Sequence, residues 1–138
     1  MNTIDKVIYT ARTHTTGGTD GNVRSDDGRL LLQLSPPEVP GTGTNPWQLF
    51  AAGWSACFLG AIGHIAKLRE LALSKDVAVD AEVDFGAAAG GFVIQARLRV
   101  TLPGIDLETA RALVNAAHAA CPYSKATRGN IAVSIDLA

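Results

Sequence analysis

The chain has 138 residues, of which 47% are apolar and only 18% are charged. A chain of this length can bury a core of its own without a metal or a disulfide scaffold. The low charged fraction predicts further buried area, most simply at a subunit interface. The 12 basic and 13 acidic side chains leave a net charge of −1 and form no basic stripe, so we expect no nucleic-acid partner.

The N-terminal segment and the cysteine count indicate the compartment. The first residues, MNTIDKVIYTARTH, do not combine a positive segment with an apolar one, so we expect no secretory signal. The chain has 2 cysteines, Cys57 and Cys121, which are too few for a secreted disulfide framework. The sequence therefore predicts a cytoplasmic protein whose two thiols are reduced or redox-active.

Three short strands are expected in the N-terminal third of the chain. The first is Ile4 to Arg12, and the second and third are Asn22 to Ser25 and Arg29 to Leu34, joined by an Asp-Gly turn. The glycine-rich turn from Thr15 to Gly21 lacks the lysine of a phosphate-binding loop and does not open a helix. We therefore expect no nucleotide site there.

A long apolar helix follows. It begins at Pro46, after a cap at Thr44 or Asn45, and extends to about Leu71. Its residues Pro46 to Ala66 carry no formal charge and are long enough to span a bilayer. The many alanines, glycines and polar side chains favour instead a central buried helix that strands wrap, so we expect no membrane span.

A hairpin, a second helix and a final strand complete the predicted order. Asp76 to Phe85 and Phe92 to Thr101 alternate apolar and polar residues, and the outer acids of one strand can face the outer arginines of the other. Asp106 caps a half-buried helix, and Asn130 to Leu137 is the last strand. The order β-β-β-α-β-β-α-β predicts one α+β domain over residues 1–138.

Both cysteines are predicted to point into apolar surroundings. Cys121 ends the apolar stripe of the second helix, and Cys57 lies on the long helix among apolar neighbours at near-whole-turn spacings: Phe50, Trp54, Ala61 and Ile65. Three interpretations are open: buried cysteines that act as small hydrophobic side chains, a redox pair, or metal ligands. His118 and Cys121 have chelating spacing, but Cys57 and His64 lie about 10 Å apart along the helix axis. A site would have three ligands at best, and we expect no metal.

Two separated stretches, TNPWQLFAAGWSACF (Thr44 to Phe58) and AACPYSKATRGNI (Ala119 to Ile131), are each centred on a cysteine. Together they resemble the OsmC/Ohr family, and most closely its organic hydroperoxide resistance (Ohr) branch. The loop TGGTDG and the turn SDDG are in register with the same family, so the resemblance covers essentially the whole chain. It implies an intertwined homodimer in which antiparallel sheets wrap two central helices, with active sites at the interface.

The resemblance also implies thiol-based reduction of organic hydroperoxides in oxidative-stress defence. Cys57 is then the peroxidatic residue, whose thiolate attacks the O–O bond and becomes a sulfenic acid with release of an alcohol. Cys121 is the resolving residue, which forms a disulfide with Cys57. A dithiol, dihydrolipoamide or a lipoylated protein, reduces that disulfide again, so no bound cofactor is implied. A pocket wall of Phe50, Trp54, Phe58 and Ile62 suits an alkyl or lipid hydroperoxide better than hydrogen peroxide.

At two positions the chain departs from the family. The family normally has an arginine in the glycine-rich loop, where this chain has Thr19, and a glutamate after Asn-Pro, where it has Trp47. In the family the arginine stabilises the thiolate and the glutamate holds the arginine. A thiol in apolar surroundings has a raised pKa, and only the thiolate attacks peroxide. Arg24 is the first candidate for a replacement cation, unless it is simply a solvated residue of its strand. Arg128 is the second candidate, unless its role is structural.

Trp47 has two interpretations. It packs against Trp54, two helical turns on, or it fills the space of the missing ion pair and, with Thr19, reshapes the substrate pocket. Two other functions therefore stand beside a hydroperoxide reductase: an apolar-ligand-binding protein that uses the old pocket, and a thiol–disulfide sensor. Replacing Cys57 by Ser abolishes the reductase and the sensor but leaves ligand binding nearly intact.

Overall fold

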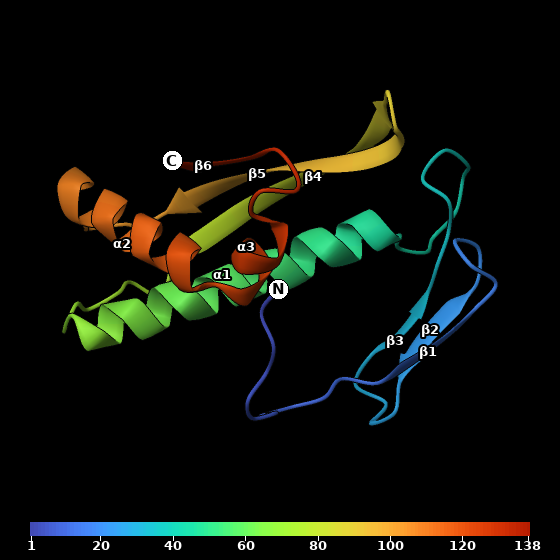
Figure 1. Cartoon of the computed structure of the whole chain (residues 1–138), viewed down its shortest axis with the longest axis horizontal. Helices are drawn as coiled ribbons and strands as arrows, with labels where there is room; N and C mark the ends of the chain where they lie inside the picture. Colours follow the sequence, from blue (N-terminus) through green and yellow to red (C-terminus); the bar gives the residue numbers. More distant parts are fainter. The chain divides into compact units, whose positions relative to one another are not determined.

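The computed structural model describes residues 1–138, which form two compact units, Met1–Pro46 and Trp47–Ala138. The expected single domain over the whole chain stays a prediction. Figure 1 shows the elements, which are β1 (Thr13–Thr16), β2 (Asn22–Ser25), β3 (Leu31–Gln33), α1 (Pro46–Leu68), β4 (Ala78–Ala88), β5 (Gly91–Thr101), α2 (Leu107–Ala120), α3 (Pro122–Thr127) and β6 (Val133–Leu137). The predicted α+β class is confirmed, and α3 is an additional helix.

The N-terminal unit contains an antiparallel sheet with the strand order β1-β2-β3. Gly17 and Gly18 have φ values of 75° and 59°, a conformation that favours glycine, and they turn the chain from β1 into β2. The predicted Asp-Gly turn is present, since Gly28 has a φ of 73° and the Ser25 hydroxyl donates a hydrogen bond to Asp27 at 2.6 Å. Both turns set the register of the sheet.

The predicted position of the first strand was wrong. Ile4 to Arg12 was expected, but β1 is Thr13–Thr16. The glycine turn pairs Thr16 with Asn22 and Thr13 with Ser25, so β2 provides partners only for those four residues. The apolar residues of the expected strand, among them Ile4 and Ile8, are exposed. The position of the strand is therefore set by the turn that pairs it with β2.

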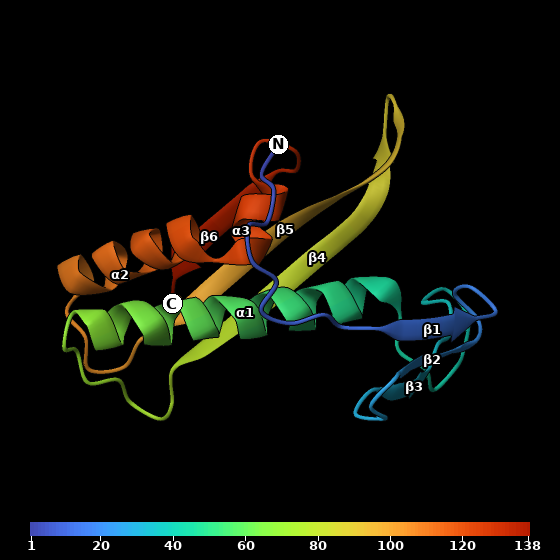
Figure 2. The same ribbon diagram turned by 60° about the horizontal axis from the view of Figure 1, so that its bottom comes forward.

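The C-terminal unit contains the sheet β4-β5-β6. β4 and β5 pair antiparallel from Ala78↔Thr101 to Ala88↔Gly91, whereas β6 pairs with β5 in parallel. The expectation of antiparallel sheets therefore needs correction for β6. A parallel partner requires a long crossover, and α2 and α3 provide it, as Figure 2 shows.

The charged outer face of the hairpin confirms the predicted pairing of acids with arginines. Arg97 on β5 forms ion pairs with Asp84 at 2.6 Å and with Glu82 at 2.7 Å, both on β4. The hydrogen bonds from Arg97 and Gln95 hold the pKa of Asp84 down to about 2. These charges stabilise a solvated sheet face.

The core of the C-terminal unit lies between α1, α2 and β5. Each element contributes a buried stripe: Trp54, Phe58, Ile62 and Ala66 from α1; Ala110, Leu113, Val114 and Ala117 from α2; Ala96, Leu98 and Val100 from β5. The helix α1 is long and apolar enough to cross a bilayer, but the core helix of a globular protein meets the same two criteria. The Asp106 cap of α2 is confirmed, because its side chain accepts a hydrogen bond from the Thr109 N–H.

The long helix ends three residues earlier than expected, at Leu68 instead of about Leu71. Glu70 has a φ of 55°, the Glu70 N–H donates to Lys67 O, and the Leu71 N–H donates to Ala66 O at 2.9 Å. This is the Schellman motif, in which a left-handed residue closes the last turn of a helix. A glutamate holds the left-handed position here, so the glycine signal that usually marks such an end is missing from the sequence.

Leu98→Ala is expected to lower the free energy of unfolding by about 2–5 kcal/mol, because it removes a side chain buried in the core and leaves a cavity. Urea unfolding followed by circular dichroism measures the change. The matched control is Leu107→Ala at the start of α2, where Leu107 is 61% exposed and a change within about 0.5 kcal/mol is expected. Equal losses in both variants would contradict this core.

Candidate active site

The two cysteines lie side by side in the C-terminal unit, although 64 positions separate them in the sequence. Cys57 is in α1, and Cys121 is at the junction of α2 and α3. The Cys121 thiol donates a hydrogen bond to the Cys57 sulfur at 3.6 Å, and both thiols are free. A disulfide bond is about 2.05 Å long, so the sulfurs need to approach by roughly 1.5 Å to form one.

The two thiols differ in exposure. Cys121 is fully buried, whereas Cys57 is half-buried. Cys57 is therefore the more accessible residue of the pair, and Cys121 lies next to it in the interior of the unit.

The junction at Cys121 depends on the proline that follows it. Cys121 has an extended backbone (φ −60°, ψ 123°), and Pro122 begins the short helix α3. Proline suits the first position of a helix because its missing N–H has no partner there. The indole N–H of Trp54 donates to the Ser124 hydroxyl at 3.2 Å, with both residues buried, and so holds α3 against α1.

The surroundings of Cys57 favour its neutral thiol. Burial raises the pKa of Cys57, and the nearby Cys121 thiol raises it further. A backbone hydrogen bond from Tyr123, in the first turn of α3, acts in the opposite direction and lowers the pKa, but the net shift is upward. The sequence analysis missed Tyr123; its position directly after Cys-Pro was the available signal.

The residues predicted to form the pocket wall differ in burial. Trp54 and Phe58 are fully buried, and only Phe50 is half-buried. Phe50 meets Trp54 edge-on at 5.7 Å between ring centroids and meets Tyr123 at 6.1 Å. Gly53 lies beside this group, and a Cβ there would come within 2.8 Å of the Tyr123 hydroxyl. The accessible part of this aromatic group is therefore Phe50 and the Tyr123 ring, and substrate contact by Phe50, Trp54 or Phe58 stays a prediction.

One interpretation expected Trp47 to pack against Trp54, but its ring contacts a different residue. Its ring stacks on Phe85 of β4 with centroids 4.3 Å apart, and Phe85 in turn meets Phe92 of β5 at 5.1 Å. The three rings help to line an open cavity of about 330 Å³, together with Val93, Ile94, Asn130 and Ile131. Trp47 stacks on a residue of the β4–β5 hairpin, and the spacing of residues along α1 does not predict this contact.

The remaining candidates fall into two groups. Thr19, in the turn after β1, and Arg24, on β2, belong to the N-terminal unit, so a role of either residue beside Cys57 stays a prediction. Arg128 donates a hydrogen bond to the His118 carbonyl oxygen at 2.6 Å, which gives it a structural contact near the end of α2. Burial and the Arg128 charge lower the pKa of His118, whose Nδ1 is buried without a hydrogen-bond partner. Across residues 1–138 no three His, Cys, Asp or Glu side chains are placed to hold a metal ion.

We expect the alkylation of Cys57 by iodoacetamide to keep accelerating with pH, by about tenfold per unit from pH 6 to 9, because only the thiolate reacts and its pKa is raised. Mass spectrometry of the peptide that contains Cys57 gives the rate. Cys57→Ser provides the background from the buried Cys121. A rate that reached its plateau below pH 8 would contradict the raised pKa.

Known proteins are similar to this chain over nearly its whole length. Residues 39–136 match the family described as OsmC-like protein. The chain is 46% identical over 138 residues to the organic hydroperoxide resistance protein of Xanthomonas axonopodis pv. citri, with 97% of each chain covered. The crystal structure of the organic hydroperoxide resistance protein OhrB of Bacillus subtilis matches with a TM-score of 0.89 at 43% identity, covering 96% of this chain and 100% of that one. An organic hydroperoxide resistance protein from Legionella pneumophila gives 0.91 at 40% identity, with 96% and 99% covered.

Proposed function

The chain belongs to the OsmC/Ohr family, on its organic hydroperoxide resistance branch, and from this premise we propose that it reduces organic hydroperoxides to alcohols through Cys57 and Cys121. The relatives support the coarser statement, a role in organic hydroperoxide defence. The observation that carries the proposal is the pair of free thiols at 3.6 Å, one reachable from solvent and one buried behind it.

The first step of the proposed reaction consumes the hydroperoxide. The Cys57 thiolate attacks one oxygen of the O–O bond, so that an S–O bond forms and the O–O bond breaks. The other oxygen leaves with the organic group and takes up a proton to become the alcohol. Cys57 is left as a sulfenic acid, oxidised by two electrons, and the hydroperoxide has been reduced by the same two electrons.

The second step joins the two sulfurs. Cys121 loses its proton and attacks the Cys57 sulfur, the S–O bond breaks, and the leaving hydroxide takes up a proton to become water. The hydrogen bond from the Cys121 thiol to Cys57 already aligns the two sulfurs for this step. Because Cys121 is fully buried, its own direct oxidation by a bulky hydroperoxide is disfavoured.

A reductant must then return the disulfide to two thiols. We propose a dithiol, dihydrolipoamide or a lipoylated protein, which exchanges its own thiols for the protein's disulfide and needs no bound cofactor. The cytoplasm, where thiols are kept reduced, is the compartment that suits this cycle. A homodimer is part of the proposal, and exposed apolar side chains such as Ile8, Tyr9 and Phe92 are candidates for burial in it.

The surface next to Cys57 indicates the substrate class. The Tyr123 backbone forms a hydrogen bond with Cys57, and the Tyr123 ring meets Phe50 at 6.1 Å between centroids, so an aromatic surface extends from the site. An alkyl or lipid hydroperoxide gains binding free energy by burying its apolar part against such a surface, whereas hydrogen peroxide has no apolar part to bury. We therefore propose organic hydroperoxides as the preferred substrates.

The deciding experiment adds one equivalent of cumene hydroperoxide to the reduced protein and follows the intact mass and the count of free thiols. We expect both thiols to disappear, with an internal disulfide and a mass lower by two hydrogens. Thiols that survive for many minutes would overturn the proposal. The chain would then be a binding protein for apolar ligands, and ligand screening would replace peroxidase assays.

A further inference from the structure

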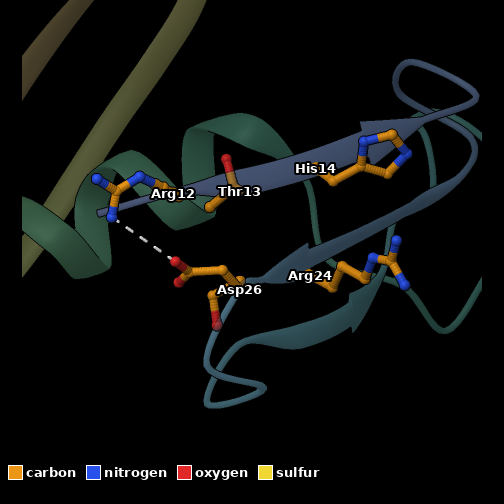
Figure 3. Close-up of a pocket in the computed structure, with 6 residues that line it drawn as sticks. Arg12, Thr13, His14, Arg24 and Asp26 are labelled. Carbon is orange, nitrogen blue, oxygen red and sulfur yellow. Dashed lines mark ion pairs between the residues drawn. The ribbon is translucent and has the colours of Figure 1, made fainter. Parts of the chain in front are cut away.

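One face of the N-terminal sheet carries two basic side chains that lie directly opposite one another. His14 of β1 and Arg24 of β2 are partners in the antiparallel register. Side chains on directly opposite positions point to the same face of a sheet with their Cβ atoms about 5 Å apart. Figure 3 shows the His14 ring and the Arg24 guanidinium extending in the same direction along the strand pair.

Neither basic group forms an ion pair. The acidic residue in the lining of the adjoining cavity is Asp26, and it pairs with Arg12 at 3.8 Å, as the dashed line in Figure 3 marks. Both members of that pair are more than half exposed, so it is weak. Its opposite charges nevertheless compensate each other, which leaves the Arg24 guanidinium without a carboxylate partner and the His14 ring without an ion pair.

The pair also borders open space on both sides. A cavity of about 410 Å³ is lined by Arg12, Thr13, His14, Arg24, Ser25 and Asp26. A second one, of about 290 Å³, is lined by His14 and Arg24 together with Thr16, Asn22, Val23 and Leu31. Apart from Asp26, neither lining contains an acidic residue. The only basic residues shared by the two cavities are therefore the unpaired ones.

An anion that binds here gives the unpaired Arg24 guanidinium a counter-charge and reaches the His14 ring on the opposite strand. The guanidinium offers parallel N–H donors that match the two oxygens of a carboxylate or a phosphate, and an imidazole N–H adds another donor from the neighbouring strand. We propose that Arg24 and His14 form a binding site for a small oxyanion, a carboxylate or a phosphate group, on this face of the N-terminal sheet. The inference does not depend on the peroxidase proposal, because no cysteine takes part in it.

The test is an NMR titration of the full-length protein with inorganic phosphate and, in a separate arm, with acetate, each at constant ionic strength set by sodium chloride. We expect saturable shifts of the His14 ring and Arg24 Nε–H signals in at least one arm, and the arm with the tighter saturation identifies the oxyanion. Arg24→Gln should weaken the binding about tenfold or more, since it removes the charged fork. His14→Asn, the second variant, should weaken it as well.

Arg29→Gln is the matched control, because Arg29 is an exposed arginine of the neighbouring turn that already faces Asp27 at 4.0 Å. We expect it to keep the affinity of the unmodified protein, and amide spectra confirm that each variant is folded. Shifts that spread over the surface without saturating, or equal losses in Arg24→Gln and Arg29→Gln, would overturn the proposal. The side-chain shifts and the amide spectra are measured without hydroperoxide, so the result is separate from any role of Arg24 in activating Cys57.

Discussion

Cys57→Ser is expected to lower hydroperoxide consumption by on the order of 100-fold or more, because loss of a catalytic nucleophile removes the covalent step itself. A serine hydroxyl is almost entirely protonated at neutral pH and does not form a sulfenic acid. The measurement is the consumption of cumene hydroperoxide with dihydrolipoamide as reductant. Full consumption by the Cys57→Ser protein would contradict every step proposed for the thiols.

Cys121→Ser is the matched variant, and its expected result is different. Cys57 keeps its reactivity, so one equivalent of hydroperoxide is reduced and a sulfenic acid accumulates that dimedone traps on Cys57. No internal disulfide forms, because its second sulfur is absent. If the unmodified protein also formed no internal disulfide, the sulfurs that lie 3.6 Å apart would not lead to a bond, which would contradict the second step.

The double variant Thr19→Arg/Trp47→Glu is expected to raise the rate of Cys57 oxidation on the order of tenfold. It introduces the arginine and the glutamate that the resemblance to the family implies at these positions. A cation beside the sulfur lowers the pKa of Cys57, which burial now raises, and so increases the fraction of reactive thiolate at neutral pH. Stopped-flow measurement of thiol oxidation by cumene hydroperoxide provides the rate.

The two single variants test whether the introduced residues act as a unit. Trp47→Glu alone breaks the stack with Phe85, worth about 0.5–1.5 kcal/mol of stability beyond the area that it buries. It also adds a carboxylate without its arginine, so no gain in rate is expected. Thr19→Arg alone lacks the carboxylate that positions it. A double-mutant cycle gives the coupling between them, and purely additive effects would contradict a cooperating pair.

The elements that could be predicted from the sequence are those whose signals are local. The hairpin β4–β5 follows from alternation with charges on one face, and the observed register does bring Arg97 next to Glu82 and Asp84. The start of α1 follows from Pro46, and the cap of α2 follows from Asp106. Each of these features is decided by residues within a few positions of one another.

The errors concern features that distant parts of the chain decide. Strand β1 lies where the turn at Gly17 gives it partners, β6 is parallel because α2 and α3 return the chain to the same edge, and Trp47 stacks on a residue of another element. The cysteines were identified by their motifs, but a separation of 64 positions says nothing about distance. The contribution of the Tyr123 backbone to the pKa of Cys57 depends on the path of α3, which no periodicity reveals.

The position of Cys121 between two helices affects how the sulfurs can meet. Its N–H donates to Ala117 of α2 at 2.8 Å, and its carbonyl oxygen accepts from Lys125 of α3 at 3.0 Å, so the backbone of this one residue belongs to both helices. Cys57, by contrast, is embedded in an uninterrupted run of helix. Because its backbone is bonded to both helices, a rotation about the Cys121 dihedral angles that moves its sulfur also changes the orientation of α3, and of Tyr123 on it, relative to α2.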